Sequence, residues 1–308
     1  MRAAVVGASG FIGSHLVDGL LTEGYRVRAL ARHLPGMISA EAQANPALSL
    51  QPLDMTDRLG LEQALAGVDL VVHLASGSLP HSSNRNPQDD VGVNLLGALN
   101  LLEASRSAGV QRLLVVSSGG TVYGIPQQVP IPEDHPTDPL CSYGITKLAI
   151  EKYVALYRQL HGLDGLVLRL ANPYGERQRL DASQGVVPVF LGRALRFEPL
   201  EIWGDGSTVR DFLHISDVVS ALLAACRYEG PERLFNIGSG TGLSLRELVE
   251  LLEHELDRSL EVHYQEGRSF DVPTNVLCID RANRCLGWKP KVTTVEGLQR
   301  FHQSLISH

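Results

Sequence analysis

A short apolar segment runs directly into three evenly spaced glycines near the start of the chain. Residues 3–6 suit a buried strand, Gly7, Gly10 and Gly13 follow at intervals of three, and residues 11 to about 21 suit a helix. Glycines at such a junction permit a tight strand-to-helix turn and let the backbone approach a pyrophosphate, which the helix N-terminus attracts. The common pattern is G-x-G-x-x-G, and Ser9 replaces its middle glycine here. The loop therefore predicts a dinucleotide site, with an ordinary tight turn as the alternative.

Apolar runs that suit buried strands recur over the first 170 residues, with amphipathic stretches between most of them. These runs are Ala3–Val6, Val27–Leu30, Leu48–Leu50, Leu70–Leu74, Leu113–Val116 and Leu166–Leu170. Such alternation predicts an α/β fold, a doubly wound parallel sheet of the Rossmann type with helices on both faces. Ligands of these sheets bind at the carboxyl ends of the strands.

The expected elements become shorter after about Asn172, which predicts a smaller α+β lobe. Its strand-like pieces are Leu200–Trp203, Phe212–His214, Leu234–Ile237, Val262–Tyr264 and Val276–Ile279. We assign residues 1–172 to a dinucleotide-binding domain, whose sheet later segments can complete. Residues 173–308 are assigned mainly to a substrate-binding lobe, with the ligand site in the cleft between the two parts.

Composition excludes several classes of protein. The net charge is −7 over 308 residues and no basic stripe is present, which argues against binding to nucleic acid. No apolar run approaches the roughly 18 residues of a membrane span, and the N-terminus is unlike a signal peptide. We expect a cytoplasmic protein without a membrane partner. The four cysteines lack metal-ligand spacing, so no metal site is predicted.

Tyr143 and Lys147 lie four residues apart on the longest expected helix, which is predicted to run from Asp138-Pro139 to His161-Gly162. A phenol acts as general acid or base on a carbinol only if its pKa, about 10 in water, moves toward neutrality. The positive charge of a lysine one turn away predicts that shift, and its donors can also hold ribose hydroxyls.

These features, with further motifs in the same order, resemble the extended short-chain dehydrogenase/reductase family. The motifs are residues 115–124 (VVSSGGTVYG), 72–75 (VHLA), 168–175 (LRLANPYG), 204–206 (GDG), 209–212 (VRDF), 235–238 (FNIG) and 268–288. The similarity covers nearly the whole chain and is greatest to the UDP-glucose and UDP-N-acetylglucosamine 4-epimerases of its NAD-dependent epimerase/dehydratase branch. It implies an isomerase of carbohydrate metabolism or polysaccharide biosynthesis that interconverts UDP-GlcNAc and UDP-GalNAc, UDP-Glc and UDP-Gal, or both.

The resemblance also implies roles for individual residues. Tyr143 would remove the proton of the sugar 4-hydroxyl while hydride passes to NAD, and Lys147 would lower the pKa of that tyrosine. The family places a serine or threonine hydroxyl on the substrate at a position that is Gly119 here. We assign the catalytic hydroxyl to Ser118, with Thr121 as the alternative and with a third possibility that the serines only line the cofactor loop. Tyr123 lacks a lysine one turn later, so we assign it to structure.

The cofactor residues carried over from the family are Gly7, Gly10, Phe11, Ile12, Gly13, Arg32, Asp54, Met55, Leu74, Ala75, Ser117, Tyr143, Lys147 and Pro173. NAD-preferring relatives end the second strand with an acidic residue, whereas Arg32 lies here after Ala31. An arginine can bind a 2′-phosphate, which favours NADP. An epimerase returns its hydride to the same substrate and retains NAD. We expect NAD and keep NADP open, and Asp54 resembles the residue that contacts adenine.

The substrate residues carried over are Thr121, Asn172, Arg210, Arg268, Asp271 and Asn275. The resemblance places Asn172 and the two arginines on the diphosphate and Asp271 near the uridine ribose. Relatives restricted to UDP-glucose have a bulky tyrosine at the position of Asn275. The smaller amide would leave room for an N-acetyl group and could bond to it.

Two other functions stay open. Arg32 and Gly119 favour an NADPH-dependent reductase of a 4-keto nucleotide sugar. The fold also occurs in non-catalytic dinucleotide-binding regulators, although the Tyr143 and Lys147 pair argues against one. The resemblance further implies a homodimer formed through helices near Leu95–Ala108 and Ser142–Leu160.

Overall fold

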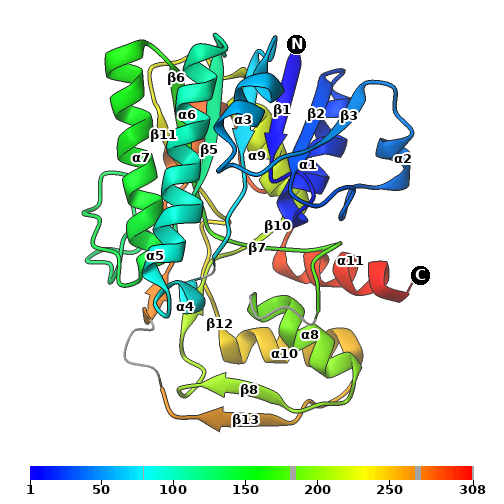
Figure 1. The fold of residues 1–308 in the computed structure, drawn as a ribbon. Helices are drawn as coiled ribbons and strands as arrows, with labels where there is room; N and C mark the ends of the chain where they lie inside the picture. Colours follow the sequence, from blue (N-terminus) through cyan, green and yellow to red (C-terminus); the bar gives the residue numbers. More distant parts are fainter. Residues whose placement is uncertain (79, 181–184, 268–271, 307–308) are drawn as a thin grey trace.

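The main lobe is built on a seven-stranded sheet (Figure 1). The structure, a computed structural model, describes residues 1–78, 80–180, 185–267 and 272–306. The strand order is β11-β6-β5-β4-β1-β2-β3, and every neighbouring pair is parallel. The strands are β1 (Arg2–Val6), β2 (Arg26–Ala31), β3 (Leu48–Pro52), β4 (Leu70–His73), β5 (Arg112–Ser118), β6 (Asp164–Leu170) and β11 (Leu234–Ile237). The predicted doubly wound parallel sheet is confirmed.

Helices cover both faces of this sheet because successive side chains of each strand point to opposite faces. Ala3 and Val5 pack with α1 (Phe11–Thr22) and α9 (Ile215–Arg227) on one face. Ala4 and Val6 pack on the other face with α3 (Arg58–Leu65), α6 (Gly97–Ser107) and α7 (Ser142–His161). Within the described part of the chain, no helix combines the length and apolar character that a membrane crossing requires.

The remaining elements of the main lobe are short. They are α2 (Ala40–Gln43), α4 (Pro80–Ser83), α5 (Pro87–Asp90) and the π-helical segment η1 (Val91–Leu96). The strand order reverses between β1 and β4, which lie side by side. In an open parallel sheet the ligand crevice forms at this reversal, outside the carboxyl ends of the strands. The glycine loop after β1 is therefore placed at the expected binding edge.

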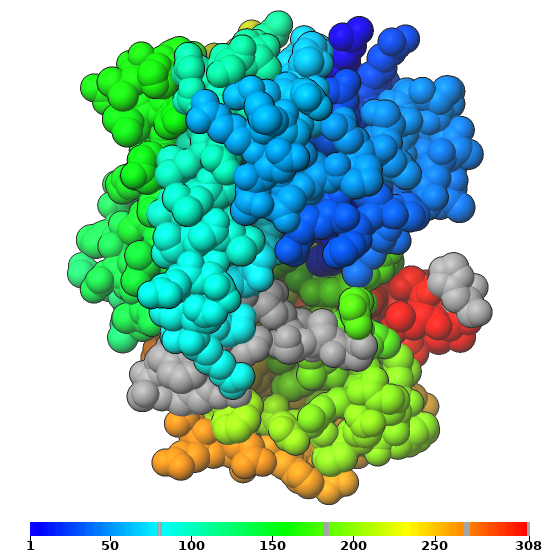
Figure 2. Space-filling model, viewed as in Figure 1, coloured from blue at the N-terminus to red at the C-terminus, as the bar shows by residue number. Residues whose placement is uncertain are grey.

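The second lobe lies below these carboxyl ends (Figures 1 and 2). It contains α8 (Val186–Leu195), α10 (Leu245–Leu256), α11 (Thr294–Ile306) and strands β8 (Leu200–Trp203) and β13 (Val262–Gln265). Its own apolar core includes Phe190, Leu248 and Phe301. Short strands connect the lobes: β7 (Asn172–Tyr174), β9 (Val209–Arg210), β10 (Phe212–His214), β12 (Leu243–Ser244) and β14 (Thr274–Asn275). The π-helical segment η2 (Ala282–Leu286) packs back on the main lobe, against α9 and β11. The chain thus crosses between the lobes several times.

Three sequence predictions need correction. Residues Leu234–Ile237 were expected in the small lobe, but they form β11 at the edge of the main sheet, beside β6. The predicted strand Val276–Ile279 is instead β14 two residues earlier, and Leu277 only bridges to Ile131. A single bridged pair of residues is too short to form a strand.

The long helix was expected to begin at Asp138-Pro139, but α7 begins at Ser142. The carbonyl oxygen of Asp138 packs so closely on Gly124 that a Cβ there would lie 2.0 Å away. The segment before the helix is therefore held by this tertiary contact, and Cys141 is extended. The helix ends as expected, with Gly162 in the left-handed conformation at its C-terminus.

Candidate active site and cofactor pocket

A cavity of about 1130 Å³ lies between the carboxyl ends of the strands and the second lobe. It brings together most of the residues predicted from the sequence. The predicted residues in its lining are Gly7, Gly10, Phe11, Ile12, Gly13, Leu74, Ser117, Ser118, Thr121, Tyr143, Lys147, Asn172, Pro173 and Arg210. One pocket thus joins the glycine loop, the tyrosine and lysine, and three of the six expected substrate residues.

The glycine loop fits a dinucleotide because its backbone leaves no room for side chains. Gly7 has a φ of +92°, and a Cβ on it would lie 2.7 Å from the amide nitrogen of Ala75. A Cβ on Gly13 would lie 2.1 Å from the carbonyl oxygen of Gly7, so α1 packs directly on the loop. Above Gly10, in contrast, the nearest atom would be 3.4 Å away. Since no described side chain caps α1, its first N–H groups are available to a phosphate.

Tyr143 and Lys147 lie one turn apart on α7, as predicted, with the lysine Nζ 5.6 Å from the centre of the phenol ring. The Nζ donates a hydrogen bond to the carbonyl oxygen of Val116 at 3.1 Å. Burial lowers the pKa of Lys147 to about 8, although the nearby negative charges of Asp90 and Glu151 raise it.

The expected lowering of the tyrosine pKa is wrong for the ligand-free protein. Burial raises the pKa of Tyr143 to about 12, and a hydrogen bond with the Ser76 side chain only partly opposes this. The phenol is consequently protonated at neutral pH before a ligand binds. Positive charge brought into the cavity by a ligand would lower this pKa.

The strand end after β5 packs Gly119, the position of the family hydroxyl residue, closely against Leu277. A Cβ on Gly119 would lie 2.5 Å from a Leu277 methyl carbon, so a serine does not fit without movement. Ser118 and Thr121 both line the cavity, and the Thr121 hydroxyl is buried without a hydrogen-bond partner in the described structure. Ser117 is not a candidate for the catalytic hydroxyl, because its own hydroxyl donates a hydrogen bond to Glu151.

Four residues expected at the cofactor lie outside the described lining of the cavity. Arg32 is exposed, and its charge helps to lower the pKa of Asp54, after two hydrogen bonds from Thr56. Met55 packs on Gly97 of α6. The backbone of Ala75 packs against Gly7, and its side chain packs on the core that α3 and α6 share with the sheet. Arg32 and Asp54 therefore lie within electrostatic range of each other, both exposed just after β2 and β3.

The substrate residues divide into three groups. Asn172 and Arg210 line the cavity, and Arg210 donates to the carbonyl oxygen of Val272 at 2.7 Å. Asn275 is outside the described lining and only 2% exposed, and it donates to the carbonyl oxygen of Gly119 at 3.1 Å. Its own Oδ1 is buried without a described partner. Arg268 and Asp271 lie outside the described residues.

Several lining residues were missed by the sequence analysis. Ser76, Asn84 and Arg85 reach the cavity from the irregular segment after β4. Asp90 fixes part of that segment to α7 by accepting hydrogen bonds from Ser142 and Thr146, both at 2.7 Å. Only Ser76 carried a usable signal, because it follows a predicted buried strand at its carboxyl end.

Comparison with known proteins agrees with this geometry. The model of the NAD dependent epimerase/dehydratase family matches residues 3–238. The chain belongs to this family. The UDP-glucose 4-epimerase of Mycolicibacterium smegmatis is 36% identical over 304 residues, with 97% of each chain covered. The dTDP-4-dehydro-6-deoxyglucose reductase of Escherichia coli is 32% identical over 315 residues, covering 98% of this chain and 96% of the relative.

A solved structure of the family has the same fold. The UDP-glucose 4-epimerase of Thermotoga maritima with UDP-glucose superposes with a TM-score of 0.93 at 36% identity, over 100% of this chain and 99% of that one. The prediction of an NAD-dependent member of the epimerase/dehydratase family is confirmed. NAD fits the cavity because the glycine loop leaves a side-chain-free cradle at the N-terminus of α1.

Proposed function

We propose that the chain is a 4-epimerase of UDP-hexoses that acts through a 4-keto intermediate. The observation that carries the proposal is the single cavity that holds the glycine loop, Tyr143 with Lys147, and the polar pair Asn172 and Arg210. Similarity to UDP-glucose 4-epimerases over almost the whole chain supports it. Arg210 supplies a positive charge for a diphosphate, and Asn172 an amide.

The proton chemistry belongs to Tyr143. NAD held at the glycine loop and near Lys147 would supply the hydride acceptor for this reaction and a positive charge in the cavity. Tyr143 then takes the proton of the sugar 4-hydroxyl and gives it back after the 4-keto sugar has turned its other face. Lys147 stabilises the phenolate by its charge. Ser118 lines the same cavity and donates a hydrogen bond to the substrate oxygen, with Thr121 as the second candidate.

A reductase of 4-keto nucleotide sugars is the second candidate function. The similarity to the E. coli reductase over 98% of the chain favours it, and so does Arg32 at the end of β2. The two reactions differ in their redox balance, because a reductase consumes one reduced nicotinamide cofactor per turnover and an epimerase consumes none. Non-catalytic dinucleotide binding would leave both reactions absent.

The decisive experiment incubates the purified protein, without added cofactor, with UDP-glucose and separately with UDP-GlcNAc. We expect each 4-epimer to form, resolved by NMR, and the protein to release NAD on denaturation. Turnover only after NADPH and a 4-keto nucleotide sugar are supplied would replace the proposal by the reductase. No reaction under either condition would leave a binding protein.

We propose further that Asn275 admits N-acetylated sugars. It pairs in register with Arg210, which lines the cavity, and its partnerless Oδ1 is available to an amide N–H. Asn275→Tyr should lower kcat/KM for UDP-GlcNAc at least tenfold more than for UDP-glucose, because a bulky ring fills the space beside C2. Asn275→Ser is the control, since it removes the Gly119 hydrogen bond without adding bulk. Equal losses on both sugars in the tyrosine variant would contradict this role.

We also propose a homodimer through α6, η1 and α7, which lie side by side (Figure 1). Apolar side chains on α7 are exposed over four turns, at Ile145, Tyr153, Leu156 and Leu160, and Leu96 of η1 is exposed as well. An exposed apolar face of this kind favours association. Sedimentation should therefore give about twice the 33.4 kDa of one chain. A single 33.4 kDa species at micromolar concentration would contradict the dimer.

A further inference from the structure

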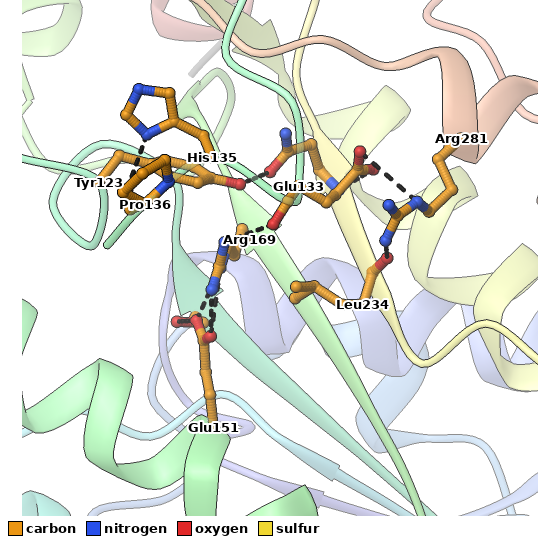
Figure 3. A network of polar contacts seen from close by, with 10 residues as sticks. Tyr123, Glu133, His135, Pro136, Glu151, Arg169, Leu234 and Arg281 are labelled. Carbon is orange, nitrogen blue, oxygen red and sulfur yellow. Dashed lines mark hydrogen bonds and ion pairs between the residues drawn. The ribbon is translucent and has the colours of Figure 1, made fainter. Parts of the chain in front are cut away.

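A buried carboxylate lies one turn beyond the lysine on the catalytic helix. Tyr143, Lys147 and Glu151 follow at intervals of four on α7 and so share one face of it. Glu151 is 7% exposed and forms an ion pair with Arg169 of β6, in which Nη2 and Oε2 are 2.7 Å apart. Figure 3 shows this pair from close by. Neither residue lines the cavity within the described structure.

Lys147 and Glu151 of α7 hold two consecutive residues at the end of β5. Lys147 donates to the carbonyl oxygen of Val116 at 3.1 Å, and Glu151 accepts from the hydroxyl of Ser117 at 2.5 Å. The next residue is Ser118, which lines the cavity. The position of Ser118 relative to the tyrosine and lysine therefore depends on the contacts that hold Val116 and Ser117.

Arg169 is itself fixed from the opposite side. Its guanidinium lies over the ring of Tyr123, 4.7 Å from the ring centre, and donates to the carbonyl oxygen of Glu133. The Tyr123 hydroxyl donates to Asn236 of β11 at 2.6 Å (Figure 3). Glu151 thus joins α7 to β5, β6 and β11 through one satisfied network, which defines a single arrangement of these elements.

We propose that Glu151 is a positioning residue for the reaction. Its carboxylate, held by Arg169, fixes Ser117 and with it the adjacent Ser118 against the face of α7 that carries Tyr143 and Lys147. The inference rests on the proposed function, because it concerns how the same site is held.

Glu151 also places negative charge toward Lys147. The charged or titratable groups that face this lysine are Asp90 from α5, Tyr143 and Glu151 from α7, and His73 from β4. Burial and the lysine charge lower the pKa of His73 to about 3, so it stays neutral. The two carboxylates therefore oppose the burial that lowers the pKa of Lys147.

The test uses Glu151→Gln in the intact protein. We expect kcat to fall at least tenfold with a change in KM below about twofold, because the turn at Ser118 loosens while the sugar site is untouched. The alkaline limb of the pH profile should move down by about 0.5–1 unit, because Lys147 loses a stabilising negative charge. Ser117→Ala, which keeps the ion pair, should lower kcat without moving that limb.

Two further variants separate positioning from stability. Glu151→Gln with Arg169→Gln leaves no unpaired guanidinium buried beside α7, so a fall in kcat that persists in this variant reports lost positioning and not a buried unpaired charge. Asp164→Asn is the matched control, since Asp164 pairs with Arg112 at the opposite ends of the same two strands, β5 and β6, at 2.8 Å. It should lower the melting temperature without changing the pH profile.

A measurement that needs no turnover completes the test. The rate at which acetic anhydride labels Lys147, followed by peptide mass spectrometry against pH in the ligand-free protein, reports the titration of this lysine. A lower midpoint in Glu151→Gln supports the proposal, even if the wild type fails to epimerise and the proposed function falls. An unchanged midpoint together with unchanged kcat in a folded variant would overturn it. If Glu151→Gln does not fold, an unchanged kcat in Ser117→Ala would overturn the proposal instead.

Discussion

Tyr143→Phe should reduce kcat by about three to four orders of magnitude while the protein still binds NAD. The substitution removes only the phenol oxygen, which is the group placed to exchange the proton of the sugar hydroxyl, and general acid–base catalysis contributes about 10²–10⁴-fold. The ring itself remains beside Lys147. The measurements are epimerisation followed by NMR and NAD released from the denatured protein.

Tyr153→Phe is the matched control for this loss. Tyr153 lies on the same helix but is 36% exposed and outside the described lining of the cavity, so its activity should stay within about twofold of wild type. Undiminished turnover in Tyr143→Phe would remove this residue from the mechanism. Loss of bound NAD from the same variant would instead make its role structural.

The main sheet could be predicted because its central strands are buried on both faces. Such strands are continuous apolar runs, as in Ala3–Val6 and Leu113–Val116, and they stand out from the amphipathic helices between them. Leu234–Ile237 is also a mostly apolar segment, yet its predicted place in the small lobe was wrong. Its partner β6 lies more than 60 residues earlier, and nothing in a local pattern specifies pairing over that distance.

The candidate site likewise has some residues whose positions a local sequence pattern predicts and others whose positions depend on the tertiary fold. The glycines lie in one loop, and Tyr143 and Lys147 lie on one helix. Their relative positions therefore follow from their spacing in the sequence. Ser76 and Asn84 reach the cavity because tertiary hydrogen bonds tie their segment to α7, through Asp90 and through Asn84 itself. The pKa of Tyr143 could not be predicted either, since it depends on how deeply the folded chain buries the phenol.

Lys147→Met should remove activity and yet stabilise the ligand-free protein. The lysine is almost completely buried, and the lowering of its pKa from 10.5 to about 8 measures the cost of keeping its charge there at neutral pH. A shift of this size corresponds to about 3 kcal/mol. Loss of the hydrogen bond to Val116 offsets about 1 kcal/mol of the gain. We therefore expect a free energy of unfolding about 1–2 kcal/mol above wild type at pH 7.

The pH dependence gives this prediction its sign. Between pH 8 and 10.5 the unfolded chain holds a proton on Lys147 that the folded chain has lost, so wild-type stability rises relative to the variant across this window. The advantage of Lys147→Met should accordingly be complete below pH 8 and absent above about 10.5. Lys152→Met is the control for the same change of residue type, because this lysine is exposed on the same helix, and its free energy of unfolding at pH 7 should stay within about 0.5 kcal/mol of wild type. A Lys147→Met protein less stable than wild type at pH 7 would mean that the site gains more from this charge than burial costs, and that catalysis and stability do not compete at this position.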